Sequence, residues 1–206
     1  RNEPAVTVLH EATDVAVRYA GAGSPLAVQN LLFLGEAQLA AGDLPRAAIT
    51  LSSAHDLALS QYGAAHLLAL RTALAVARAA AAAGDLDGAQ TQLSAVIIGL
   101  RKLGTQGETN LALALETLGD VQLGKSETQG ATAALQEAVA LREKSPDNTW
   151  ELAQARERLA ESLLAQGAGN AAPALLKRAA HDLELQLGAN HPETLRAKSA
   201  LAQLHT

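Results

Sequence analysis

The sequence contains no cysteine and no methionine, and aromatic residues make up only 2% of its 206 residues. Without cysteine the chain can form neither a disulfide nor a thiolate metal site. With so few rings, the apolar 49% of the chain is mostly Ala, Leu and Val. Ala and Leu favour helices, whereas strands prefer β-branched and aromatic residues. The composition therefore predicts an all-α fold of closely packed helices.

Basic clusters and long apolar runs are also missing. The formal net charge is -5 and Lys and Arg do not gather in one stretch, which argues against nucleic-acid binding. No uninterrupted apolar run reaches the ~18 residues of a spanning helix, which argues against membrane insertion. We expect a soluble domain that begins inside a longer protein, either cytoplasmic or in the extracytoplasmic part of a membrane-anchored signalling protein.

The chain repeats itself with a period of about 42 residues. The segment Leu34–Ala54 matches Val76–Val96, Leu118–Ala138 and Leu159–Ala179, at steps of 42, 42 and 41 residues. Three columns of the alignment hold chemically similar residues in every repeat. The first is Ala5, Ala47, Ala89, Ala131 and Ala172, and the second is Leu9, Leu51, Leu93, Leu135 and Leu176. The third is Ala12, Ala54, Val96, Ala138 and Ala179. Their spacings of 4 and 7 residues place them on one face of a helix.

Each repeat is predicted to contain two helices, helix A and helix B. Helix A ends at a turn marked by Gly42, Gly84, Ser126 and Gly167, and helix B ends near Gly63, Gly104, Pro146 and Gly188. Ser24-Pro25 and His191-Pro192 are start signals for helix A. We expect one array over 1–206 with about ten helices. It comprises a lone helix B (1–22), full repeats at 24–63, 66–104, 108–146 and 149–188, and a final helix A (191–206).

A short motif matches the phosphate-binding loop of nucleotide hydrolases. Gly119–Ser126 reads GDVQLGKS and satisfies G-x-x-x-x-G-K-[ST]. Such a loop follows a parallel strand and directs successive backbone N–H groups at the anion. Gly119 instead falls in a column of small residues inside helix A, where the N–H groups are already bonded. A nucleotide hydrolase is therefore retained only as an alternative.

The repeat resembles the tetratricopeptide repeat through Leu34-Gly35, Ala47, Leu51 and Ala54. Its period exceeds the usual ~34 residues and is similar to the 42-residue variety of kinesin light chains and bacterial signalling proteins. The junction LGANHPETLRAKSALAQL, Leu187–Leu204, resembles that variety's linker. HEAT-type repeats are the second choice. The resemblance implies a right-handed superhelical solenoid of antiparallel helix pairs, with helix A lining its concave wall.

The chain departs from the kinesin light chains at their cargo-recognition positions. Those proteins carry a pair of Asn residues in helix A, and no Asn stands at the matching positions of this chain. These positions are Leu32-Phe33, Leu74-Ala75, Glu116-Thr117, Glu157-Arg158 and Ser199-Ala200. The resemblance thus implies a general role in holding proteins or peptides, without the family's known ligand specificities.

Positions 29, 32, 33 and 36 of the first full repeat and their equivalents are expected to line the concave wall. These columns vary between repeats, whereas the packing columns do not. The candidate binding residues are Gln29, Leu32, Phe33, Glu36, Arg71, Leu74, Arg78, Glu116, Asp120, Glu157, Glu161 and Arg196.

Two pairs of carboxylates suggest an acidic wall. Glu116 and Asp120 lie four residues apart, as do Glu157 and Glu161, and like charges at this spacing cost about 0.2–0.5 kcal/mol per pair. Arg158 can relieve the second pair, and no cation is evident for the first. We predict that a basic or amine-bearing segment binds here; the alternative is a merely solvated face.

Apolar side chains suggest a second contact region. Leu32, Phe33 and Leu74 are expected to form an exposed patch that anchors a ligand side chain or packs against repeats outside this chain. Trp150 opens the fourth full repeat, where packing is favoured over ligand stacking.

The six histidines do not predict a metal site. His66 and His191 occupy the cap position held by Ser24 in the first full repeat, and the others lack a companion at the i, i+4 ligand spacing. These others are His10, His55, His181 and His205. No catalytic constellation stands out, so we expect no enzyme, no metal and no cofactor.

The sequence therefore predicts a protein- or peptide-binding scaffold or sensor. Its parent would be a larger bacterial regulatory protein such as a Ser/Thr kinase or transcription regulator. A small-ligand-sensing superhelix is the alternative. Because terminal repeats need polar outer faces, exposed apolar surface is expected near Val8 and Val15, with self-association there.

Overall fold

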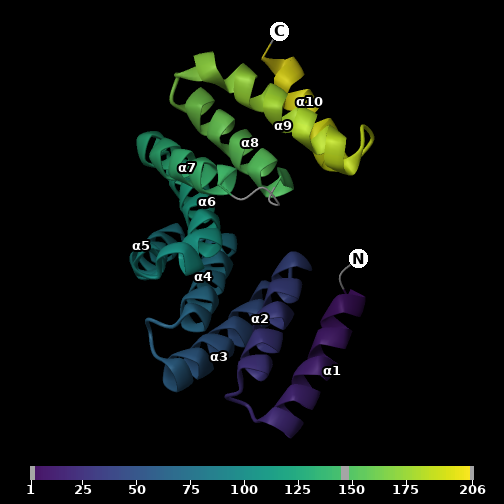
Figure 1. The fold of residues 1–206 in the computed structure, drawn as a ribbon, viewed down its shortest axis with the longest axis vertical. Coiled ribbons are helices and arrows are strands. Elements are labelled where there is room, and N and C mark those ends of the chain that lie inside the picture. Colours follow the sequence, from purple (N-terminus) through teal and green to yellow (C-terminus); the bar gives the residue numbers. More distant parts are fainter. Residues whose placement is uncertain (1–2, 145–148, 205–206) are drawn as a thin grey trace. The chain divides into compact units, whose positions relative to one another are not determined.

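A computed structural model describes residues 3–144 and 149–204 (Figure 1). Within these ranges the chain is helical and contains no strand, which confirms the all-α prediction. It forms two compact units, Arg1–Gly107 and Glu108–Thr206.

The first unit contains five α-helices and one short 3-10 helix in its described residues. They are α1 (Glu3–Ala20), α2 (Pro25–Ala40), α3 (Leu44–Tyr62), α4 (Leu67–Ala82), α5 (Leu86–Lys102) and η1 (Gly104–Gly107). Consecutive helices pack against each other, and α2 also contacts α4. In the terms of the repeat, α2 and α4 are helices A, whereas α1, α3 and α5 are helices B.

The second unit repeats this arrangement. Its elements are α6 (Glu108–Gly124), α7 (Thr128–Glu143), α8 (Thr149–Ala165), η2 (Gly169–Ala171), α9 (Ala172–Leu187) and α10 (Pro192–Gln203). Consecutive helices again pack together, and α6 contacts α8. Helices α6, α8 and α10 are helices A, and α7 and α9 are helices B.

The predicted turn residues end the helices A. Gly42, Gly84 and Gly167 have φ angles of 81°, 88° and 75°, a left-handed backbone that glycine adopts without steric cost. In the third full repeat Ser126 takes this place with a φ of 63°, the only positive φ of a non-glycine in the described residues. The turn geometry is therefore kept even where the sequence departs from glycine.

The predicted caps also begin the helices A. The side chains of Ser24, His66 and His191 accept hydrogen bonds from the backbone N–H groups of Ala27, Leu68 and Glu193. Each acceptor satisfies one of the unpaired donors of a helix N-terminus. Capping is thus the observed role of His66 and His191.

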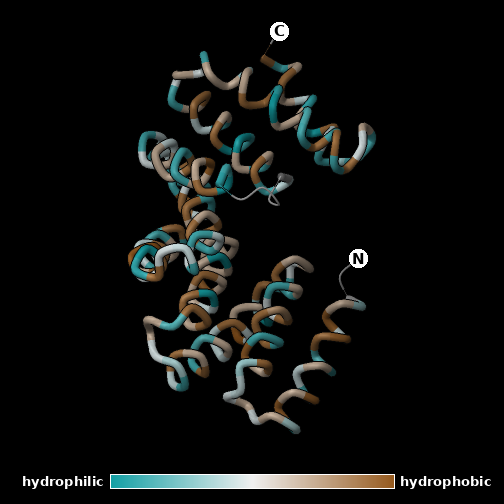
Figure 2. The backbone as a smooth tube through the Cα atoms, viewed as in Figure 1, coloured by the Kyte–Doolittle hydropathy of each residue, from teal (hydrophilic) through white to brown (hydrophobic). Residues whose placement is uncertain are grey.

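The repeat-defining columns form the core. In the four full repeats, the recurring Ala, Leu and Ala or Val positions of helix B are buried. Gly119 of α6 faces Leu135 of α7 so closely that a Cβ atom added to it would lie 2.5 Å from the leucine Cγ. The apolar and polar segments that alternate along the helices in Figure 2 follow from this one-sided packing.

The phosphate-loop motif does not have the structure that its chemistry needs. Gly119–Gly124 belongs to α6, and Lys125 and Ser126 form the turn that follows. The Nζ atom of Lys125 lies 3.1 Å from a carboxylate oxygen of Glu127. With no strand before it in the described part of the chain, this segment is an ordinary junction between helix A and helix B.

The first helix exposes apolar side chains, as predicted. Val8, Val15 and Tyr19 of α1 are exposed, and the repeat-defining Ala5 and Leu9 are far less buried than their equivalents in α3. Separately, none of the described helices combines the length and the apolar character needed to cross a membrane.

Candidate functional site

The candidate site is the helix-A face, defined here as the side of the A helices that carries positions 29, 33 and 36 and their equivalents. In the first unit, Gln29 and Arg71 are partly buried and Phe33 is 43% exposed. Phe33 is therefore the large apolar side chain that this part of the face offers to a partner.

The exposed apolar patch expected at Leu32 and Leu74 is wrong. These residues are 2% and 3% exposed, and Leu32 packs in a cluster with Leu51, Ala75 and Ala79. Position 32 and its equivalent 74 belong to the packing between helices, so Leu32 and Leu74 do not extend the exposed apolar surface of Phe33.

An ion pair links the two A helices of the first unit. The Nη1 atom of Arg78 donates a hydrogen bond of 2.8 Å to Glu36. These residues occupy the same position in consecutive repeats, 42 residues apart. Each side chain remains about one third exposed, so both can still contact a partner at the surface.

In the second unit Glu116 is buried. The Nε atom of Arg142, on helix B of the same repeat, donates a hydrogen bond of 2.8 Å to it. Arg158 of α8 lies 3.7 Å from the other carboxylate oxygen. An ionised carboxylate is expensive to bury without such partners, so the two arginines are what allow Glu116 to be there.

The expectation that no cation relieves the Glu116–Asp120 pair is wrong. Arg158 donates a hydrogen bond of 3.1 Å from its Nε atom to Asp120, in addition to its contact with Glu116. Arg158 therefore neutralises the first carboxylate pair, in the preceding repeat, rather than the second. Burial nevertheless raises the pKa of Asp120, and the nearby Glu116 adds to this effect while Arg158 opposes it.

Glu157 is also buried, and Arg196 of α10 is its partner. Two guanidinium nitrogens of Arg196 donate hydrogen bonds of 3.0 and 2.8 Å to the two carboxylate oxygens. The hydrogen bonds from Arg196 to Glu157 raise the pKa of Arg196. Such two-point pairing is strong and directional, so it ties α10 to α8.

Glu161 differs from the other carboxylates of this face. It is exposed, and it forms no ion pair with any residue that the structure describes. Although its side chain reaches solvent, partial desolvation by the surrounding protein raises its pKa, and the charges of Glu157 and Asp120 raise it further while Arg196 and Arg158 oppose them. Arg142, Arg158 and Arg196 thus contact Glu116, Asp120, Glu157 and Glu193, whereas Glu161 has no such contact among the described residues.

No protein-family model and no curated protein matches this chain, but solved structures do. One crystal structure of a putative kinesin light chain from Podospora anserina, with nearly identical TPR-like repeats, aligns with a TM-score of 0.68 and 19% identity. The match covers 90% of this chain and 88% of that one. A second crystal structure of the Podospora protein gives 0.65 and 19%, with coverage of 90% and 89%.

A crystal structure of BtubC (BKLC) from P. vanneervenii is similarly close. Its TM-score is 0.68 at 16% identity, and the match covers 81% of this chain and 66% of BtubC. The chain has the fold of kinesin-light-chain-like tetratricopeptide repeats. At this level of identity the likeness concerns the fold, so the chemistry of the helix-A face must be judged from this chain's own residues.

Arg158 and Arg196 were named from the sequence without these pairings, and Arg142 was missed altogether. Arg142 stands in a helix-B column that otherwise holds Ala58, Leu100 and Leu183, all of them buried. A charge in an apolar column is the signal that could have revealed it. Since Glu116 likewise replaces Leu32 and Leu74, the two changes together mark an ion pair.

The structure also places Trp150 and His10, two further residues considered in the sequence. Trp150 is 43% exposed on α8, so much of its ring is in solvent. His10 lies 3.4 Å from Asp14 on α1, and His205 lies outside the described residues. No group of three potential metal ligands gathers anywhere in the described chain.

Proposed function

We propose that this chain binds a protein or peptide segment through its helix-A face. Its tetratricopeptide-like fold supports a role as an interaction scaffold. Arrays of this kind present an extended surface made of the same positions in successive repeats. On this face the residues accessible to a partner are Gln29, Phe33, Glu36, Arg71, Arg78, Asp120, Glu161 and Arg196.

The observation that carries the proposal is the unpaired carboxylate of Glu161 beside Asp120. Burial and neighbouring negative charge raise the pKa of both groups, which means that their ionised forms are poorly stabilised in the free protein. A Lys or Arg side chain of a partner would supply the missing counter-charge. We therefore propose a basic segment as the occupant of the second unit.

A peptide-display selection tests this function. The immobilised chain is exposed to a library of random peptides, and selected peptides are synthesised and titrated by calorimetry. We expect enrichment of Lys and Arg, and binding that weakens as salt is raised. The double variant D120K/E161K should weaken the selected peptides at least tenfold.

A matched control comes from the opposite side of the unit. Gln136 is exposed on α7, a helix B, so Q136K adds positive charge without altering the helix-A face. Q136K should retain peptide affinity. Enrichment of acidic or uncharged peptides, or equal affinity for all three proteins, would contradict the proposal.

The same scaffold role fits a regulatory parent protein. We propose that the chain is part of a bacterial regulator such as a Ser/Thr kinase or a transcription regulator, because its high Ala content and its excess of Arg over Lys are typical of GC-rich genomes. The coding sequence on either side of this segment tests the idea. A kinase core or a DNA-binding domain would support it, and a parent with neither would oppose it.

Self-association through α1 is a further part of the proposal. Val8, Val15 and Tyr19 are 64%, 54% and 81% exposed, and repeat arrays normally cover such faces with a neighbouring repeat. Light scattering of the 206-residue chain should show a mass that grows with concentration. V8K/V15K should remove this growth; a strict monomer at high concentration would overturn the proposal.

A further inference from the structure

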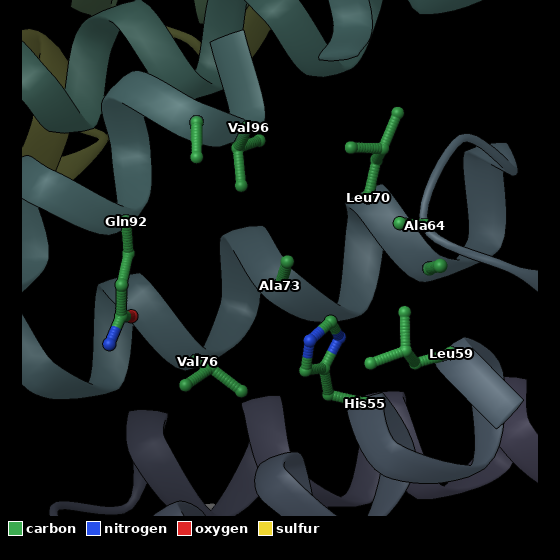
Figure 3. Close-up of a pocket in the computed structure, with 10 residues that line it drawn as sticks. His55, Leu59, Ala64, Leu70, Ala73, Val76, Gln92 and Val96 are labelled. Carbon is green, nitrogen blue, oxygen red and sulfur yellow. The ribbon is translucent and has the colours of Figure 1, made fainter. Parts of the chain in front are cut away.

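A cavity of about 470 Å³ lies in the first unit, where α3 and α5 face each other across α4 (Figure 3). We call it the α3–α5 cavity. Figure 3 shows His55 and Leu59 of α3 on one side and Val96 of α5 on the other, with Ala73 of α4 between them. It has the form of a slot between two B helices, with a helix A as its floor.

This cavity is separate from the helix-A face. Ala73 and Val76 form its floor, while Arg71 and Arg78 lie on the helix-A face of the same helix. Two residues correspond to roughly 200° of rotation around an α-helix, so the two sets point in nearly opposite directions. A ligand in the cavity would therefore leave the proposed peptide-binding face open.

The floor is built from side chains that are shorter than those of neighbouring repeats. Ala73 stands where the repeats on either side have Leu31 and Leu115, and Val76 stands where they have Leu34 and Leu118. Apolar space left by shortened side chains forfeits packing contacts. The local sequence therefore deepens the slot at a cost in packing.

The corresponding space between α1 and α3 has a different chemistry. It measures about 430 Å³, and its lining includes Asp14, Arg46 and His10, with the longer Leu31 and Leu34 as its floor. The α3–α5 cavity has no Asp, Glu, Lys or Arg among its lining residues, all of which the structure describes. The fold thus provides a slot in both places, but of the two only the α3–α5 cavity lacks Asp, Glu, Lys and Arg in its lining.

Besides the Gln92 amide, His55 is the polar side chain of the cavity lining, and its ring gives the cavity a directional hydrogen-bonding group. Its Nδ1 atom lies 3.2 Å from the hydroxyl of the buried Thr72, and the backbone carbonyls of Leu68 and Ala69 lie 3.1 and 2.9 Å from the same hydroxyl. We assign the arrangement in which the Thr72 hydroxyl donates to one of these carbonyls and Nδ1–H of His55 donates to the hydroxyl oxygen. A neutral imidazole protonated at Nδ1 leaves Nε2 as a hydrogen-bond acceptor.

We propose that the α3–α5 cavity binds a small neutral aromatic molecule that carries one hydrogen-bond donor. Its volume falls within the range of small-molecule sites, which are mostly apolar with a few polar groups. A charged ligand would lose its hydration without gaining a counter-charge. The flat ring lies in the slot against Ala73 and Val76, and its donor reaches Nε2 of His55. The site is independent of the proposed peptide-binding function.

An NMR titration with indole tests the proposal on the whole chain. The methyl groups of Val76 and Val96 and the ring of His55 report the cavity directly. We expect their signals to shift in a saturable manner, while the methyl groups of Val6 and Ile49 in the charged α1–α3 space stay in place. Absence of saturable shifts up to the solubility limit of indole, or shifts in the α1–α3 space alone, would overturn it.

Two substitutions separate shape from hydrogen bonding. A73L restores the residue of the neighbouring repeats and should weaken indole at least tenfold without lowering the melting temperature. H55L removes the hydrogen-bond acceptor. Its affinity for indole should fall to the affinity of the unsubstituted protein for N-methylindole, a ligand without an N–H donor. The unsubstituted protein should bind indole several-fold better than N-methylindole. Equal affinities for the two ligands, or undiminished binding to A73L, would contradict the assignment.

Discussion

The guanidinium of Arg142 lies 2.8 Å from the carboxylate of Glu116, and each of these side chains is only 6% exposed. One repeat earlier, the two positions are held by Leu74 and Leu100, which are also buried. A buried ion pair thus replaces two leucines of the preceding repeat. The stability of the fold does not require this pair, because the preceding repeat packs without it.

Removal of one member of the pair should be costly. R142L leaves the carboxylate of Glu116 in the core with only the more distant Arg158 at 3.7 Å. We expect the free energy of unfolding to fall by about 3–5 kcal/mol, measured by urea denaturation monitored by circular dichroism.

Replacement of both members should reverse that loss. E116L/R142L restores the apolar residues of the preceding repeat, and such exchanges are often neutral or stabilising by about 1–4 kcal/mol. A double variant as unstable as R142L alone would show that the apolar columns are not equivalent between repeats.

The helix-B leucines should be essential to packing. Leu93 and Leu135 are completely buried in their respective units. Leu93→Ala or Leu135→Ala should lower the free energy of unfolding by about 2–5 kcal/mol through the cavity that each leaves. A loss below about 0.5 kcal/mol in chemical unfolding, against the 2–5 kcal/mol expected, would mean that the helix-B core is incorrectly assigned.

Glu161 should make stability depend on pH in a defined direction. Its raised pKa means that the folded chain binds this proton more tightly than the unfolded chain does. The free energy of unfolding should therefore fall as pH rises from the ordinary pKa of 4.5 through the raised value. At neutral pH, E161Q should be more stable by about 0.2–0.5 kcal/mol, since it removes one like-charge pair with Glu157.

The control for this effect is the same substitution elsewhere. Glu11 is exposed on α1, and E11Q should leave the pH dependence as it is in the unsubstituted chain. Superimposable curves of unfolding free energy against pH for E161Q and E11Q would contradict the claim that neighbouring carboxylates raise the pKa of Glu161.

The phosphate-loop motif should be inert towards nucleotide. Because Gly119 is packed inside α6 and Lys125 contacts Glu127, ATP with Mg²⁺ should not raise the melting temperature in a thermal-shift assay. A rise that disappeared in Lys125→Ala would restore the nucleotide hydrolase.

Most of the fold could be predicted from the repeat period. Small residues that end helices, polar caps and uniform packing columns each act locally, so Gly42, Ser24 and Leu51 could be placed from the sequence. The buried carboxylates were not placed, because a charged residue in a variable helix-A column resembles a solvated one unless the helix-B column of its partner is compared as well. Their partners also lie far along the chain: Arg142 is 26 residues from Glu116, and Arg196 is 39 from Glu157.

The α3–α5 cavity was not predicted from the sequence, for a different physical reason. Ala73 and Val76 are ordinary helix residues, and only comparison with the leucines of adjacent repeats shows that they are short. His55 appeared as a histidine without a metal-ligating companion. Its hydrogen bond to Thr72 depends on how α3 packs against α4, which no local pattern encodes.

The most direct test of the proposed function is to locate a selected basic peptide on the second unit by methyl NMR. Leu113 of α6 occupies the position equivalent to Gln29, whereas Leu185 is 73% exposed on α9, a helix B. We predict saturable shifts of the Leu113 methyl groups and none at Leu185. Shifts at Leu185 with Leu113 unchanged would contradict binding at the helix-A face.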